Sequence, residues 1–338
     1  VEDLVRDLVR EADDDIELAQ YGIIYIDELD KIASSRNLIG ADVSRTGVQR
    51  ALLKPMEETD VDLKIPHDPI SMLQEIERFR KSGKRDKRIV NTKNILFIMS
   101  GAFTGLEQII NKRISKQEIG FGAHIIGSHE RINILQQVFP EDLITFGFES
   151  EFVGRLPVKA VFEKLTEEDL YEILKNPNNP IILEKKLDFA AYGIEVKFED
   201  EALRILSKRA FDENTGARGL VSVFEMALLL FEKKLRSTNI KKLPVTAFFI
   251  EQPEKALETL LSPLNEEKLI ASFNELAGKE KESVKEYVQT NRQRLSKRYN
   301  LTMTQSRIDI VASFYCKHIM DIGHVVEKIK TFYDGVII

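Results

Sequence analysis

The chain has 338 residues, of which 31% are charged and 43% are hydrophobic, and its formal net charge is −6. This composition is typical of a globular protein of about two or three domains, and no apolar run reaches the ~18 residues of a membrane span. The N-terminus shows no secretory signal pattern. A single cysteine, Cys316, excludes an internal disulfide and a cysteine-based zinc site, which favours the cytoplasm. The acidic balance makes nucleic acid an unlikely main partner.

The first half of the chain alternates between predicted strands and predicted helices. Apolar residues at helical spacing predict an amphipathic helix over residues 1–20. Two apolar runs, 22–26 and 94–99, predict strands that are buried on both faces of a parallel sheet. Further helices are predicted over residues 47–58, 70–81 and 140–146. This alternation predicts an α/β layer.

The second half predicts a smaller α+β domain followed by helices alone. Thr166 and Asp169 have the spacing of a capping box, which predicts a helix ending at residue 175, and residues 194–198 predict a strand. The remaining helices are predicted over residues 200–211, 219–236, 254–261, 265–277, 281–298 and 302–330, the last with a break near Gly323. The predicted domains are residues 1–164, 165–252 and 253–338.

Two adjacent acids, Asp27 and Glu28, follow the first predicted strand. The carboxyl edge of a parallel sheet is where α/β folds bind ligands. In a Walker B element, Asp27 would help to hold Mg²⁺ through its water shell, and Glu28 would polarise the water that attacks the γ-phosphate of ATP. The alternative is a strand that ends in a solvated acidic turn.

Three further residues are candidates for contacts with a nucleotide. Ser100 ends the second predicted strand and is a candidate γ-phosphate sensor, although a serine there is commonly a turn residue. Arg155, on a predicted turn, is either an arginine finger or an ordinary surface arginine. Arg218 precedes a long predicted helix, whose N-terminus favours anions, or else pairs with Asp212 or Glu213.

The segment Ile119-Gly120-Phe121 is followed by a second glycine and predicts an apolar loop tip. Exposed apolar groups of this kind are typical of a surface that binds a partner. The alternative is a tight turn that folds back into the core.

Taken together and in order, these segments resemble the AAA+ unfoldases of the Clp/Hsp100 group, with the ClpX family nearest and HslU as a sister family. The resemblance covers about residues 1–250, and each motif is weaker alone than the ordered set. The matching stretches are GIIYIDELDKI (22–32), DVS (42–44) with GVQ (47–49), ALLK (51–54), SGAF (100–103), IGFGA (119–123), PEDLI (140–144), EFVGRLPV (151–158) and TGARGL (215–220).

The resemblance implies a parallel AAA+ sheet with flanking helices, a smaller lid domain and a homohexameric ring. Such a ring uses ATP and Mg²⁺ to unfold and translocate protein substrates, and passes them to a ClpP-type peptidase. Residues 37–43 would form the second pore loop, and Ile119-Gly120-Phe121 would dock on the peptidase. The implied nucleotide-handling residues are Asp27 and Glu28 as Walker B, Ser100 as sensor 1, Arg155 as the finger that reaches the neighbouring subunit's nucleotide, and Arg218 as sensor 2.

The chain also departs from this family. No G-x-x-x-x-G-K-[ST] phosphate loop occurs, since only Gly122 and Gly127 have the glycine spacing and Ser128 follows in place of lysine. In the family that loop and the aromatic pore loop lie upstream of the first predicted helix, so we expect these 338 residues alone to be inactive as an ATPase. The basic run at residues 78–88 replaces the family's Arg-Lys-His substrate loop, and residues 253–338 match nothing in the family.

These motifs leave three candidate functions open. The leading hypothesis is an ATP-dependent unfoldase subunit, because a scaffold has no physical need for Asp27, Glu28, Arg155 and Arg218 together. The alternative is a non-motor AAA+ regulator or scaffold that binds nucleotide and partners without processing substrates, and the unmatched tail supports it. A DNA-remodelling AAA+ protein is disfavoured by the net charge of −6.

Overall fold

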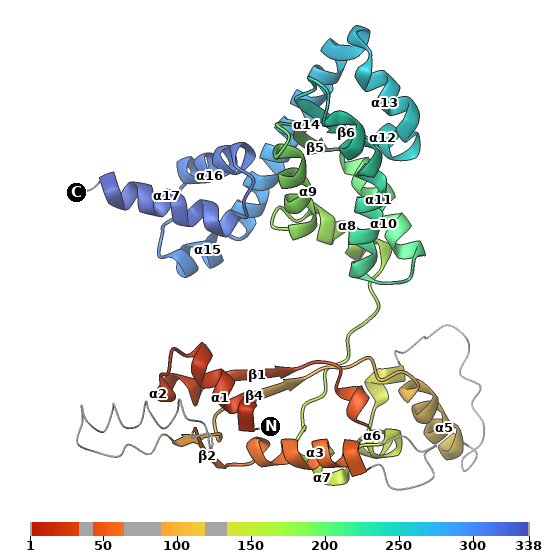
Figure 1. Cartoon of the computed structure of the whole chain (residues 1–338), viewed down its shortest axis with the longest axis vertical. Helices are drawn as coiled ribbons and strands as arrows, with labels where there is room; N and C mark the ends of the chain where they lie inside the picture. Colours follow the sequence, from red (N-terminus) through yellow and green to blue (C-terminus); the bar gives the residue numbers. More distant parts are fainter. Residues whose placement is uncertain (1, 34–42, 64–88, 119–133, 337–338) are drawn as a thin grey trace. The chain divides into compact units, whose positions relative to one another are not determined.

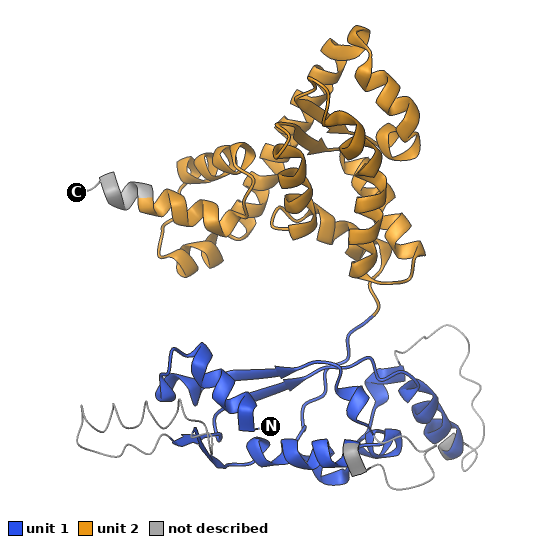
Figure 2. Cartoon of the chain, in the orientation of Figure 1, with its two compact units in different colours: residues 1–163 blue, residues 164–338 orange. Residues whose placement is uncertain are grey.

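The computed structural model describes residues 2–33, 43–63, 89–118 and 134–336 (Figure 1). These residues belong to two compact units, Val1–Glu163 and Lys164–Ile338, which are described separately (Figure 2). The helix predicted over residues 70–81 and the segment Ile119-Gly120-Phe121 lie outside the described residues, as does all of the candidate second pore loop except Val43.

The first unit is built on a parallel pair of strands, β1 (Ile23–Ile26) and β4 (Leu96–Met99), which lie side by side in Figure 1. Both strands were predicted, and their register places Ile26 beside Met99. An antiparallel pair that the sequence analysis missed, β2 (Asp60–Asp62) with β3 (Ile89–Asn91), adds Val61 and Val90 to the same core.

The prediction that β1 and β4 are buried on both faces is wrong for the described residues. Ile24 packs with Val5 and Val9 of α1 (Glu2–Glu11), whereas Ile23 and Tyr25 are 59% and 60% exposed. Successive side chains of a strand point to opposite faces, and the described helices cover only one of them. A continuous apolar run therefore does not by itself show that both faces are covered.

The predicted helix over residues 1–20 is interrupted. The helix α1 ends at Glu11, and α2 (Ile16–Ala19) begins after Asp13 and Asp14 adopt left-handed backbone angles of φ 52° and 65°. Asp15 then caps α2 by accepting a hydrogen bond from the backbone N–H of Leu18. Short polar residues are the ones that tolerate this conformation and form such caps.

Further helices complete the first unit. The helix α3 (Val43–Met56) follows η1 (Leu29–Ile32), and α6 (Pro140–Phe146) has its predicted bounds. Three elements were not predicted, α5 (Leu106–Glu118), η2 (Ile134–Gln137) and α7 (Ser150–Gly154). Leu29, Leu52, Phe148 and Phe152 form a second core among η1, α3 and α7.

The second unit opens with the capping box predicted at Thr166, whose hydroxyl accepts a hydrogen bond from the N–H of Asp169. A small parallel sheet pairs the predicted strand β5 (Glu195–Phe198) with β6 (Lys242–Val245), which was not predicted. One core extends from Leu170 to Leu260. It is enclosed by α8 (Glu167–Lys175), α9 (Pro180–Ala190), α10 (Asp200–Asp212), α11 (Ala217–Leu235), α12 (Ala247–Glu251) and α13 (Pro253–Leu261).

The rest of the chain is helical, as predicted, but with different limits. After η3 (Pro263–Asn265), one long helix, α14 (Glu266–Thr290), covers the predicted helix 265–277 and the first part of the helix predicted over 281–298, with Gly278 in its interior. The last three helices are α15 (Arg292–Tyr299), α16 (Gln305–Lys317) and α17 (Ile322–Val336).

Two cores of the second unit share α14. Its Leu269 packs against the first core, and its Val284 and Val288 belong to another core formed with α16 and α17. The predicted break near Gly323 falls at residues 318–321 instead, and Gly323 is the second residue of α17. The predicted division into a lid (165–252) and an extension (253–338) remains a prediction.

Candidate functional site

The carboxyl ends of β1 and β4 form the best-defined polar site of the first unit. The N–H of Ser100 donates to the carbonyl of Ile26 at 2.9 Å, and the N–H of Leu29 donates to the carbonyl of Ser100 at 2.7 Å. These backbone bonds carry the parallel ladder one residue beyond each strand. They place Asp27 directly beside Ser100, as the sequence analysis anticipated for one edge of a sheet.

The side chains at this edge form a hydrogen-bonded chain. The hydroxyl of Ser100 donates to Oδ1 of Asp27 at 2.5 Å, and the hydroxyl of Tyr25 lies 2.6 Å from Oγ of Ser100. A serine hydroxyl has one proton, so Tyr25 donates to Ser100 while Ser100 donates to Asp27. Tyr25 was not predicted as part of the site, although its spacing of two residues from Asp27 places both side chains on one face of the strand.

Glu28 adopts an unusual backbone conformation at the turn. Its φ of 54° and ψ of 38° lie in the left-handed region, which is rare for a residue with a side chain. Its N–H donates to Oδ1 of Asp27 at 2.8 Å, which offsets part of the strain. Strained residues of this kind cluster at functional sites, and here the turn directs two adjacent exposed acids to the edge of the sheet.

The turn after Ser100 approaches η1 closely. A Cβ atom on Gly101 would lie 2.7 Å from Oδ1 of Asp30 and 3.1 Å from its backbone nitrogen. Only glycine allows this separation without movement of the neighbouring backbone. Gly101 therefore keeps the segment after Asp27 and the segment after Ser100 in contact.

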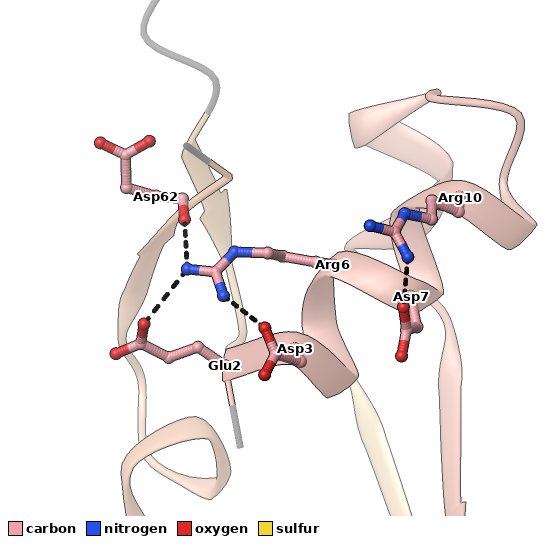
Figure 3. Close-up of polar contacts among 6 residues, drawn as sticks. All are labelled: Glu2, Asp3, Arg6, Asp7, Arg10 and Asp62. Carbon is pink, nitrogen blue, oxygen red and sulfur yellow. Dashed lines mark hydrogen bonds and ion pairs between the residues drawn. The ribbon is translucent and has the colours of Figure 1, made fainter. Parts of the chain in front are cut away.

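A cavity of about 320 Å³ adjoins the two acids. Its lining residues come from α1, β1, η1 and α3, and they are Asp3, Leu4, Ile26, Asp27, Glu28, Leu29, Ile32, Val48 and Leu52. Arg6 holds α1 in place by donating to Glu2, to Asp3 and to the carbonyl of Asp62 in β2 (Figure 3). The α1 residues that line the cavity, Asp3 and Leu4, are therefore linked through Arg6 to the β2–β3 pair.

Gln49 connects the site to the surrounding helices. It is fully buried, and its amide donates to the carbonyls of Ile32 at 2.8 Å and Gly147 at 3.3 Å. Its carbonyl accepts from the N–H of Glu149 at 2.8 Å. A buried amide with all these bonds made specifies one arrangement of η1, α3 and the α6–α7 connection. Its place on the apolar face of α3, before Leu52 and Leu53, was the available sequence signal.

Arg155 contacts Glu57 rather than Asp27, Glu28 or Ser100. It is the residue after α7, and its guanidinium donates to Glu57 at 2.6 Å. Its side chain is 51% exposed. The structure thus pairs Arg155 with a residue that the sequence analysis did not single out.

Arg218 belongs to the second unit, at the second position of α11. It is exposed, and within the described residues it has no hydrogen-bond or ion-pair partner. The alternative interpretation, pairing with Asp212 or Glu213, is not what the structure shows. The preceding Gly216 has a φ of 66°, which glycine adopts without strain at the start of this helix.

The chemistry of the edge fits magnesium better than a softer metal. No cluster of three or more His, Cys, Asp or Glu side chains is placed for a metal ion in the part of the chain that the structure describes. Mg²⁺ needs no such cluster, because it keeps several waters and takes oxygen ligands from one or two carboxylates and from phosphates. Asp27, Glu28 and Ser100 offer oxygen donors only.

None of the described helices could cross a membrane.

Comparisons with known proteins agree with this geometry. Residues 2–159 match the family of the AAA domain (Cdc48 subfamily), and residues 165–236 match the C-terminal, D2-small domain of ClpB protein. The chain is 40% identical over 233 residues to the ATP-dependent Clp protease ATP-binding subunit ClpX of Treponema denticola, which covers 68% of this chain and 54% of that protein. The chain is a ClpX-like AAA+ protein. The protein of the same name from Borrelia duttonii is 39% identical over 268 residues, or 78% of this chain and 58% of that protein.

This ClpX-like AAA+ chain spans little more than half the length of the curated relatives it matches. The predicted resemblance and the predicted α/β AAA+ fold with helical additions are both confirmed. Residues 237–338 lie outside both matched family ranges.

Proposed function

We propose that this ClpX-like chain is part of an ATP-dependent protein unfoldase of the Clp/Hsp100 group that hydrolyses ATP with Mg²⁺ in the cytoplasm. The observation that carries the proposal is the bond from Ser100 to Asp27 at the carboxyl edge of the sheet, beside the strained Glu28. It lies in the range that matches the AAA domain. The names of the relatives, as ATP-binding subunits of Clp protease, support the same activity.

Each residue at this edge has a proposed role. Ser100 and the N–H of Glu28 hold the carboxylate of Asp27 in one orientation, from which it would take a hydrated Mg²⁺ by its water shell. Glu28 would accept a hydrogen bond from the attacking water and orient it. When bound, Mg²⁺ neutralises charge on the phosphates.

The two arginines have proposed roles that require other partners. Arg155 would leave Glu57 and reach the nucleotide of a neighbouring subunit in a homohexamer, since an exposed ion pair is weak and is exchanged at little cost. Arg218, exposed and without a partner in the described residues, would contact the phosphates as sensor 2.

Delivery of unfolded protein to a ClpP-type peptidase is a further part of the proposal. Ile119-Gly120-Phe121 would provide the docking contact, and residues 37–43 would line the pore. The name of the relatives refers to a Clp protease, which supports this assignment. The alternative, a non-motor AAA+ regulator, draws its support from residues 237–338, which lie outside both matched family ranges.

Glu28→Gln in the full-length protein tests the proposal. The amide keeps the size of the side chain but polarises water poorly, so we expect ATP to bind while hydrolysis falls at least about a hundredfold. Glu17→Gln removes another exposed acid, in α2, and serves as the control with unchanged turnover. Near-normal hydrolysis by Glu28→Gln would instead identify Glu28 as an acidic turn residue, whereas wild-type full-length protein that binds ATP without hydrolysing it would favour the regulator.

A further inference from the structure

We propose that α15 carries a binding surface for the phosphate backbone of a nucleic acid, formed by Arg292, Arg294, Lys297 and Arg298. This surface lies outside both matched family ranges and belongs to the second unit, whereas the edge of β1 and β4 belongs to the first. Although the whole chain is acidic, its charge is unevenly distributed. From residue 287 to residue 308 the sequence has five basic residues and no acidic one.

The four cations of this basic surface are exposed, and α15 holds them on a fixed scaffold. Leu295 is buried in the C-terminal core, and Tyr299 packs against that core, which fixes the rotation of the helix. Arg294, Lys297 and Arg298 follow the i, i+3, i+4 spacing and therefore share the opposite face. The guanidinium of Arg298 lies 5.4 Å from the ring centre of Tyr299.

The charge pattern of α15, whose sequence RQRLSKRY has four cations and no acid, differs from that of α14. On the neighbouring helix α14, two cations pair with an acid one turn away, Lys279 with Glu275 at 2.7 Å and Lys285 with Glu282 at 2.9 Å. Within the described residues, no carboxylate pairs with any of the four cations of α15. Like charges at this spacing destabilise a helix. An external anion would relieve the repulsion.

The surroundings favour phosphates over other anions. Three of the four cations are arginines, whose planar forks match phosphate oxygens better than the point charge of lysine does. The neighbouring exposed side chains are amides and hydroxyls, among them Gln293, Asn300 and Thr302. No large exposed hydrophobic residue lies between Ile270 and Ile310, all of which are described. The surface thus lacks the apolar anchors typical of protein interfaces and of membrane-inserting helices.

Salt dependence of binding by the 338-residue chain tests the proposal. The probes are fluorescently labelled single-stranded RNA, single-stranded DNA of the same sequence and the corresponding duplex, followed by anisotropy over a range of KCl concentrations. With three or four phosphate contacts, we expect dissociation constants of about 10⁻⁴–10⁻⁶ M that rise with salt. Tighter binding of one probe would identify RNA or DNA as the preferred source of the phosphates.

The variant R294Q/K297Q/R298Q should bind at least about tenfold more weakly, and the slope of log K against log salt should fall by about 2–3. Glutamine is a good helix former, so the thermal midpoint should be unchanged or slightly raised. The control K208Q/K233Q/K234Q removes the same charge from exposed positions of α10 and α11 and should keep the slope. R294K/R298K should keep most of the binding.

Several outcomes would overturn the proposal. They are wild-type binding by the α15 variant, an equal loss in the control, or binding to anionic phospholipid vesicles that exceeds binding to the nucleic acids. Another is a change in sedimentation of the α15 variant without a change in nucleic-acid binding, which would indicate self-association. If the triple variant is unstable, Arg294→Gln and Lys297→Gln alone should each lower the slope by about 0.7–0.9.

Discussion

The hydroxyl of Ser100 donates a hydrogen bond of 2.5 Å to the carboxylate of Asp27, and this bond joins the ends of two parallel strands across 73 residues of sequence. Tyr25 extends the chain by its contact with Ser100. The orientation of the proposed magnesium-binding carboxylate therefore depends on both strands. A change in the pairing of β1 with β4 would directly change the orientation of the Asp27 carboxylate.

Ser100→Ala should impair the orientation of the Asp27 carboxylate while leaving the fold intact. Removing the hydroxyl leaves Asp27 with its bond from the N–H of Glu28, so we expect a stability loss of only about 0.5–1.5 kcal/mol. The activation of ATPase by Mg²⁺ in the full-length protein should require clearly more metal. Tyr25→Phe is the control, because it removes only the outer bond and should cost less activity. Unchanged magnesium dependence in Ser100→Ala would contradict the positioning role.

Arg155→Ala should abolish hydrolysis in the full-length protein while nucleotide binding and the thermal midpoint stay close to wild type. Among the described residues its ion pair is with Glu57 and is half exposed, whereas a finger is worth about 10³–10⁵ in rate in the systems measured. Glu57→Gln frees Arg155 and should retain hydrolysis.

Mixing Arg155→Ala with Glu28→Gln subunits tests whether the finger acts on a neighbour. Some interfaces then combine an intact finger with an intact Glu28, so partial activity should return. Hexamers confirmed by sedimentation that remain inactive at every mixing ratio would place the role of Arg155 within its own subunit.

Glu280→Gln should strongly destabilise the second unit. Lys186 of α9 and Lys197 of β5 both donate to Glu280 of α14, the latter at 2.5 Å, and all three side chains are largely buried. Removing the carboxylate charge leaves the buried Lys186 without its acidic partner and leaves Lys197 with Glu195 alone, at 3.3 Å, so we expect a cost of about 3–5 kcal/mol. Glu275→Gln, which breaks an exposed pair on the same helix, should leave the thermal midpoint nearly unchanged.

The pH dependence of stability gives a second measure of this cluster. Burial by itself would raise the pKa of Glu280, but Lys186 and Lys197 outweigh it and lower that pKa overall. A lowered pKa in the folded state means that the stabilisation is present above the unfolded value of about 4.3 and is lost as the pH falls further. The wild-type chain should therefore lose stability on the acid side, and Glu280→Gln should flatten that part of the profile. If the wild-type chain and Glu280→Gln lose stability equally as the pH falls below about 4.3, Glu280 is not the group responsible for the acid sensitivity.

Gly278→Ala should stabilise the chain. Gly278 lies in the interior of α14, and a Cβ atom there would meet nothing within 4 Å, so the gain is about 0.5–1 kcal/mol. The expected rise in thermal midpoint is about 2–4 °C per kcal/mol for a unit of this size. Gly323→Ala is the opposite case, because its Cβ would lie 2.5 Å from the hydroxyl of Tyr299. A lower midpoint for Gly278→Ala would show that α14 needs glycine there.

Phe121→Ala tests the docking proposal. As an anchor that reaches a peptidase ring, Phe121 would contribute about 1.5–3 kcal/mol per subunit, multiplied by avidity across the ring. Co-sedimentation with a ClpP-type peptidase should then fall steeply, with thermal midpoint and ATPase rate unchanged. A core turn would instead lose about 3–5 kcal/mol of folding stability. Loss of both binding and stability, or of neither, would contradict docking.

Local patterns determined much of the fold from the sequence. The strands β1, β4 and β5, the helix α6 and the capping box at Thr166 follow from apolar runs, periodicity and capping chemistry over a few neighbouring residues. The continuation of α14 through Gly278 was not predicted. Glycine lowers the helix propensity locally, but the packing of α14 on β5, β6 and a second core outweighs that loss of stability. The strand β6 was missed since its partner, β5, lies about 45 residues away in sequence.

The acids, hydroxyls and arginines of the candidate site could be predicted from sequence, because residue type and order on a strand are local properties. The bond from Ser100 to Asp27, the support of Ser100 by Tyr25 and the pairing of Arg155 with Glu57 became visible in the folded chain. Each of these contacts joins atoms whose separation depends on strand register and helix packing. Such contacts are fixed by the burial of cores around residues far apart in the chain, and no short motif specifies them.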